Sequence, residues 1–209
     1  MRLCSYVVVL DKGFAPNPFD GCCTLAACTP NRVGLTLKPG DWLVGHTTKA
    51  TGNQLLYAMR VSEVLDFDDY FHDVRFQSKK PKRGGTWQER MGDNIYYRVL
   101  GGWAQAFTYA HRERHFLAKD TRHPRVFVSD HFFYFGENAV PFPAEFTPLI
   151  HTSHGVRCND SPLANEFVRW LEVTFHPGRH GNPRDRDLRP GEVSEDEVLR
   201  PRRTRARRC

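Results

Sequence analysis

The pattern of hydrophobic and polar positions along the chain predicts mostly short strands. Residues 3–10 (LCSYVVVL) are apolar and rich in valine, as is typical of a buried strand. Residues 42–46 (WLVGH) follow a Lys-Pro-Gly-Asp turn and predict a second strand. Residues 55–67 alternate in polarity, which indicates a long strand with one covered face. Two later segments also have strand character: 95–100, and 125–136 with an interruption at Ser129-Asp130.

Helical character is clearest near the end of the chain. A helix is predicted from Pro162 to about Phe175, because Ser161 can cap it and proline suits the first helical position. Its apolar face comprises Leu163, Phe167, Trp170 and Leu171. Residues 69–80 predict a short helix. Residues 22–30 are compatible with a strand, but we favour a helical turn that packs on the first strand.

Composition suits one domain with a tail. The 209 residues can bury a sizeable core, and we predict a single domain over residues 1–183. Residues 184–209 have almost no large apolar side chains, which predicts a disordered, arginine-rich tail. Its nine arginines and six acidic residues contribute +3 of the formal net charge of +6. The body is therefore only mildly basic, and charge alone does not indicate nucleic-acid binding.

The predicted location is cytoplasmic, without a membrane partner. No apolar stretch approaches the length of a membrane span, and the first residues lack the features of a signal peptide. Four of the six cysteines lie within the first 28 residues, and we expect reduced, buried thiols. The phosphate loop, the dinucleotide fingerprint and the nucleophile elbow are missing, and no CxxC pair supports a metal site. The sequence does not identify a cofactor.

The order of elements at the N-terminus resembles the start of a PUA-like β-barrel. A strand, a loop, a short helix, the Gly40-Asp41 turn, a second strand and a long strand follow one another in this order in the ASCH and EVE domains. The resemblance implies an α+β fold with a mixed, mostly antiparallel, barrel-like sheet and flanking helices. It also implies a cleft between helix and barrel that holds a base or a modified nucleotide. This is an analogy of fold only.

A closer resemblance covers most of residues 5–136. The segments YVVVLDKGFAPNPFDGCCTLAACTP, GDWLVGHT, LLYAMRVSEVLDFDDYF, GDNIYY and RVFVSDHFFYFG are similar, in the same order, to the nucleotide modification associated domain family of the second type. That family is linked by genomic context to base and nucleotide modification in bacteria and phages. The resemblance implies a domain that handles a nucleotide or nucleic acid with a modified base, with companion base-modification enzymes as further partners.

Candidate binding residues lie in the N-terminal loop and in two later segments. Asn17 and Phe19 pair an amide with a stacking surface, which base recognition needs, although both could serve the loop and core alone. Thr24 could donate to a phosphate. Arg60 lies in an otherwise apolar strand, so it should face solvent or pair with a carboxylate or a ligand phosphate. Asp93 and Asn94 open a strand after a glycine-rich loop, where they could form a turn or bind.

Two titratable residues are the candidates for catalysis. Asp11 ends the first strand, where its carboxylate could accept a hydrogen bond from the amino group of a base or act as a general base. His46 ends the second strand beside a polar loop, where it could bind phosphate, act as a general acid or base, or have a structural role alone. A transferase or hydrolase acting on nucleotides or DNA would use this pair as acid and base. The alternatives are a module that binds a nucleotide or modified base without turnover, and a scaffold of a modification or phage-defence system.

Overall fold

The computed structural model describes residues 1–28, 33–150 and 155–186, which form a mixed α+β structure with three sheets. The largest sheet has the strand order β10-β1-β3-β4-β9-β11. Its strands are β1 (Leu3–Val7), β3 (Trp42–His46), β4 (Leu55–Arg60), β9 (His131–Tyr134), β10 (Val156–Asn159) and β11 (Gly178–Arg179). The β1–β3 and β9–β11 pairs are parallel, whereas the other pairs are antiparallel.

A second sheet has the order β2-β8-β5, and a hairpin forms the third. These strands are β2 (Cys23–Leu25), β5 (Glu63–Asp66), β8 (Arg125–Ser129), β6 (Tyr96–Val99) and β7 (Gly102–Gln105). Two long segments pass from the first sheet into the second, one as β4 and β5 and the other as β9 and β8. The bend is fastened where the Ser62 hydroxyl donates to the Asp130 carboxylate and accepts from its backbone N–H.

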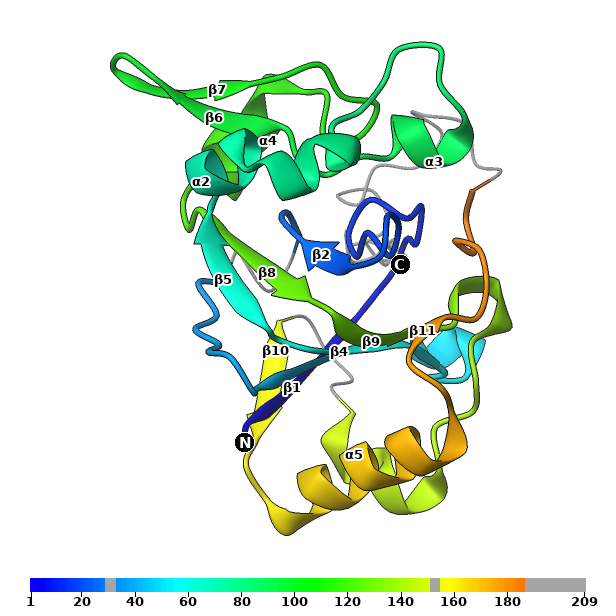
Figure 1. Ribbon diagram of the computed structural model, residues 1–209. Coiled ribbons are helices and arrows are strands. Elements are labelled where there is room, and N and C mark those ends of the chain that lie inside the picture. The colour runs from blue at the N-terminus through cyan, green and yellow to red at the C-terminus, as the bar shows by residue number, and fades with distance from the viewer. Residues whose placement is uncertain (29–32, 151–154, 187–209) are drawn as a thin grey trace, which may run out of the picture.

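Helices lie on both sides of the sheets (Figure 1). At the top of the view, α2 (Phe67–His72), α3 (Trp87–Arg90) and α4 (Arg114–Asp120) lie with the β6–β7 hairpin and form an upper layer. At the bottom, α5 (Pro162–Thr174) packs against the large sheet through Ala164, Phe167 and Leu171. The short 3-10 turns are η1 (Lys49–Thr51), η2 (Val74–Lys79), η3 (Gly136–Asn138) and η4 (Ala144–Leu149).

The structure confirms several predicted elements. The strand predicted at 42–46 is β3, the helix predicted from Pro162 is α5, and the strand at 125–136 breaks at Asp130. The helical turn favoured for 22–30 is wrong over Cys23–Leu25, because these residues pair with β8. Residues 29–30 lie outside the described residues.

The predicted barrel is not found among the described residues. The two larger sheets share their long segments, but the described strands do not close on themselves. The mixed α+β class is therefore confirmed, whereas the PUA-like architecture stays a prediction. In the described part of the chain no helix is long and apolar enough to cross a membrane.

One pair of cysteines departs from the expectation of reduced thiols. Cys4 forms a disulfide with Cys158, because β10 pairs with β1 and places the two residues directly opposite each other. Cys22, Cys23 and Cys28 are thiols, as expected. A separation of 154 residues hid this pairing from the sequence.

The predicted tail begins inside the folded body. Arg184 and Asp185 contact the backbone and carboxylate of Asp11, so they pack on the domain that we predicted to end at residue 183. Residues 187–209, which form the rest of the predicted tail, lie outside the described residues.

Candidate functional site

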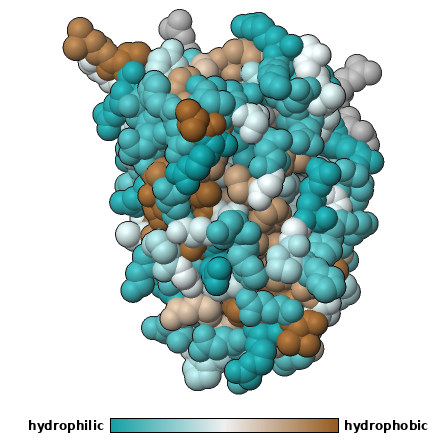
Figure 2. Space-filling view, in the orientation of Figure 1, coloured by the Kyte–Doolittle hydropathy of each residue, from teal (hydrophilic) through white to brown (hydrophobic). Residues whose placement is uncertain are grey.

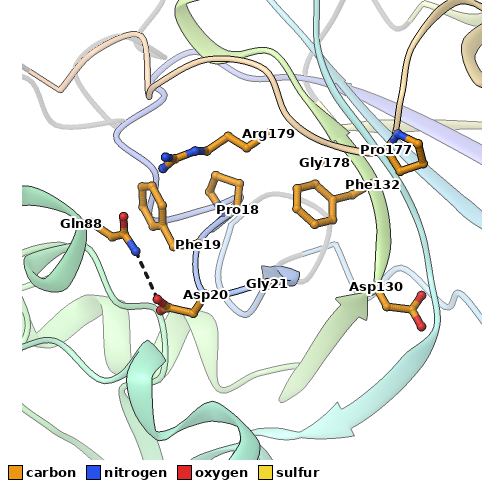
Figure 3. A pocket seen from close by; sticks show the side chains of 10 residues that line it. All are labelled: Pro18, Phe19, Asp20, Gly21, Gln88, Asp130, Phe132, Pro177, Gly178 and Arg179. Atoms are coloured by element: carbon orange, nitrogen blue, oxygen red, sulfur yellow. Dashed lines mark hydrogen bonds between the residues drawn. The ribbon is translucent and has the colours of Figure 1, made fainter.

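A pocket opens between the N-terminal loop and the segment that follows α5. Its volume is about 450 Å³, within the range of small-molecule sites. The N-terminal loop, α3, the start of β9 and the segment around β11 supply its walls (Figure 3). The lining residues are Pro18, Phe19, Asp20, Gly21, Gln88, Asp130, Phe132, Pro177, Gly178 and Arg179.

Aromatic rings and one cation give the pocket its character. Phe19 and Phe132 line the cavity and are nearly buried, so each exposes only a small part of its ring. The exposed Arg179 extends its side chain from β11 across the opening, and its guanidinium carbon lies 5.4 Å from the centre of the Phe19 ring (Figure 3). The pocket therefore combines apolar rings with a cation at its mouth, where a planar, anionic ligand would meet both.

Polar groups form another side of the pocket. The Gln88 amide donates to the Asp20 carboxylate over 3.1 Å, which joins α3 to the N-terminal loop. Asp130 is exposed, and Figure 3 shows its carboxylate directed away from the rings. Gln88 and Asp20 together offer amide and carboxylate groups that could pair with the polar edge of a base.

A buried lysine holds the N-terminal loop in place. The Lys79 ammonium donates to the backbone oxygens of Asn17, Phe19 and Cys22 and to the side-chain oxygen of Asn17, over 2.7–3.1 Å. Lys79 is 1% exposed. The Asn17 amide also donates to the Met91 carbonyl over 3.0 Å. A single buried cation therefore holds the loop that carries Phe19 through hydrogen bonds.

A second buried network surrounds Asp93. Its carboxylate accepts from the hydroxyls of Thr24 and Tyr70, each over 2.7 Å. Burial raises the pKa of the Asp93 carboxyl, an effect that the Lys79 cation and these two hydrogen bonds oppose. Asn94 donates to the carbonyls of Tyr70 and Phe76. The predicted residues Asn17, Thr24, Asp93 and Asn94 thus lie in one region, where their contacts support the loop.

Asp11 is buried and contacts residues 184–185, which follow β11 in the chain. Its carboxylate accepts from the Tyr134 hydroxyl over 2.7 and 2.8 Å and from the Arg184 backbone N–H over 3.0 Å. Burial raises the pKa of Asp11 to about 6, because the loss of hydration outweighs these hydrogen bonds. The same burial, together with Asp11, raises the pKa of Tyr134. Asp11 therefore joins the start of the chain to residue 184.

The raised pKa of Asp11 predicts a pH-dependent stability. The folded protein holds this proton more tightly than the unfolded chain, whose carboxyl titrates near 3.8. Protonated Asp11 therefore stabilises the fold by up to about 3 kcal/mol. This stabilisation is complete below about pH 4 and is lost as the pH rises through about 6. Urea denaturation at about pH 4 and about pH 6 measures the free energy of unfolding. As the pH rises, this free energy should fall for wild type relative to Asp11→Asn. A difference that stays constant, or grows in favour of wild type, would contradict the assignment.

His46 does not approach Asp11. Its Nδ1 lies 2.9 Å from the Thr47 carbonyl oxygen, and its ring packs edge-on to Phe142, which belongs to the core on the α5 side of the large sheet. Asp11 contacts Tyr134, whose ring belongs to the core on the opposite side. The structure therefore does not bring the proposed acid and base together.

Arg60 is not among the residues that line the pocket. It is the exposed last residue of β4, opposite Trp42 and His131 in the sheet, and its contact with a ligand phosphate stays a prediction. Among the predicted binding residues, only Phe19 lines the described pocket.

Sequence reasoning missed Lys79, Gln88 and Arg179, and it favoured core packing over base stacking for Phe132. The run FFYF at 132–135 was a visible signal for Phe132, and strand alternation limits how many of its rings share one face. Nothing near Lys79 separates it from the neighbouring Lys80. Within the described residues, no cluster of three or more His, Cys, Asp or Glu side chains could hold a metal ion. Burial raises the pKa of the Cys23 thiol, which disfavours a reactive thiolate there.

Comparison with known proteins identifies a family. The model of nucleotide modification associated domain 2 matches residues 1–189, which includes the pocket, both buried networks and Arg184. The comparison found no match among curated proteins or among solved structures. The match extends over nearly the whole described chain, so the chain belongs to the nucleotide modification associated domain 2 family.

Proposed function

We propose that this protein binds a nucleotide, or a nucleotide with a modified base, in the pocket beside the N-terminal loop. The observation that carries the proposal is the Arg179 guanidinium above the Phe19 ring at the mouth of a cavity of about 450 Å³. A nucleotide joins a flat aromatic base to a phosphate, and this pocket places apolar aromatic side chains beside a cation. The family match places the proposal in the context of nucleotide modification.

Each part of the ligand has a matching group in the pocket. The base would lie against Phe19 and Phe132, with its polar edge toward Gln88 and Asp20. The phosphate would lie near Arg179, whose planar guanidinium suits phosphate oxygens. The neighbouring pocket walls Pro18 and Pro177 add rigid apolar surface at small conformational cost.

The reading of the protein as a binding module rests on where the candidate catalytic residues lie. Asp11 and His46 contact the cores on opposite sides of the large sheet, and neither lines the described pocket. A hydrolase or transferase built on this pair therefore has no geometric support. A PUA-like relationship would be consistent with a base-binding pocket, and the pocket proposal does not depend on it.

A thermal-shift screen against unmodified and modified nucleotides tests the proposal. A nucleotide that binds the folded state should raise the melting temperature by about 5 °C or more at about 100 times its Kd. Arg179→Ala should lose most of this shift, because the phosphate loses its cation. Arg169→Ala, an exposed arginine on α5, is the charge-matched control and should keep the shift. A scaffold without a ligand would show no shift with any nucleotide.

A further inference from the structure

A surface of cations and aromatic rings lies on the upper layer, between the loop before α3 and residues 107–109. The Arg83 guanidinium carbon lies 3.8 Å from the centre of the Phe107 ring. Arg90 lies 5.6 Å from the Tyr109 ring and 5.7 Å from the Trp87 ring. Phe107 and Tyr109 pack edge-on with ring centres 4.9 Å apart. We call these five residues the cation–aromatic surface.

The charge of this region is positive and largely uncompensated. Residues 80–90 contain four cations, Lys80, Lys82, Arg83 and Arg90, and one carboxylate, Glu89. Lys82 pairs with Glu89 over 2.9 Å. Over the described residues, no ion pair joins a carboxylate to the exposed Arg83 or to the half-buried Arg90. The guanidinium groups therefore keep donors available for an anionic ligand.

The surface and the pocket share one short helix. Helix α3 supplies Gln88 to the pocket wall and Trp87 and Arg90 to the cation–aromatic surface. Figure 1 shows α3 at the end of the upper layer away from the tip of the β6–β7 hairpin. In Figure 2 the upper layer is mainly hydrophilic, with apolar atoms projecting at that tip, where Val99 and Leu100 are exposed. A ligand longer than one nucleotide could thus extend from the pocket across α3.

We propose that the protein binds a single-stranded segment of nucleic acid, with one base in the pocket and the adjoining nucleotides on the cation–aromatic surface. This inference rests on the proposed function, and it names the ligand as a strand rather than a free nucleotide. Bases of a single strand stack on aromatic rings and on guanidinium planes, while arginines neutralise the phosphates. A base within a duplex would have to leave its stack before it could enter the pocket.

Fluorescence anisotropy with a fluorescein-labelled single-stranded DNA of mixed sequence and about 12 nucleotides tests the inference. Wild type should bind this strand at least about tenfold more tightly than a nucleoside monophosphate, because the surface adds contacts. The double variant Arg83→Ala/Arg90→Ala should lose about tenfold in strand affinity. The slope of log Kd against the logarithm of the salt concentration should fall by about 1.4, because the variant makes two fewer phosphate contacts with the single strand.

Two comparisons make the result specific to the surface. The double variant should bind the monophosphate as wild type does, and Arg169→Ala on α5 should bind the strand as wild type does. Unchanged strand affinity in the double variant would overturn the inference, as would tighter binding of the matching duplex. Arg179→Ala reports on the pocket alone. Wild type could also bind the strand but not the monophosphate, with strand binding lost only in the double variant. That result would overturn the proposed function, whereas the cation–aromatic surface would remain a binding surface for the strand.

Discussion

Replacing Lys79 with methionine is expected to lower the free energy of unfolding by about 3–5 kcal/mol, the cost of breaking a buried charge network. The ammonium donates to four oxygens from Asn17, Phe19 and Cys22, and methionine fills a similar volume without any donor. Three carbonyls would then be buried without this partner, and the Asp93 carboxylate would lose the cation that opposes the rise in its pKa. The change should also loosen the loop that carries Phe19.

Urea denaturation measures this loss, and the adjacent lysine supplies a matched control. Lys80 is half-buried and its ammonium lies 3.7 Å from the centre of the Phe71 ring, so Lys80→Met removes only a surface cation–π contact of about 1 kcal/mol or less. Equal effects of the two substitutions would show that Lys79 does not hold the loop.

Removing the Cys4–Cys158 disulfide is expected to cost about 2–5 kcal/mol of stability. The bond spans a separation of 154 residues, so its loss frees a very long loop in the unfolded chain. It also releases β10, an edge strand of the large sheet. Cys158→Ala is the informative variant, because Cys158 is exposed and its replacement sacrifices little packing.

Urea denaturation of Cys158→Ala with and without a reducing agent separates the crosslink from other effects. Wild type should lose stability on reduction, whereas the variant should not change. Cys22→Ser, at a half-buried free cysteine, is the control and should respond to reduction as wild type does. A wild-type protein with the same stability in both conditions would contradict the crosslink.

The parts of the fold that were predictable have local causes. The strand at 42–46 follows a turn and is apolar from Trp42 to Val44, and α5 begins with a proline at its first turn. The break at Asp130 was visible as two polar residues inside an apolar run. By contrast, β2 forms because residues 23–25 pair with β8, about 100 residues later, and no local pattern reports such a partner.

The candidate site was predictable in a similar, partial way. Asn17, Thr24, Asp93 and Asn94 were chosen for their polar chemistry, and the fold brings them together as a buried support for the loop. Phe19 was chosen as a stacking surface and lines the pocket. Arg179 could not be found, because β11 has two residues and begins at the glycine of a Pro-Gly pair, which predicts only the end of a helix. Its position depends on the parallel pairing with β9.

Isothermal titration of a nucleoside and of its 5′-monophosphate, with wild type and with Arg179→Ala, tests the central claim most directly. If the pocket holds a nucleotide with its phosphate at Arg179, the variant should lose about 10- to 100-fold in affinity for the monophosphate, the worth of a charge-assisted hydrogen bond. Its affinity for the nucleoside should match that of wild type. Equal affinities of the two proteins for the monophosphate would contradict the assignment of this pocket.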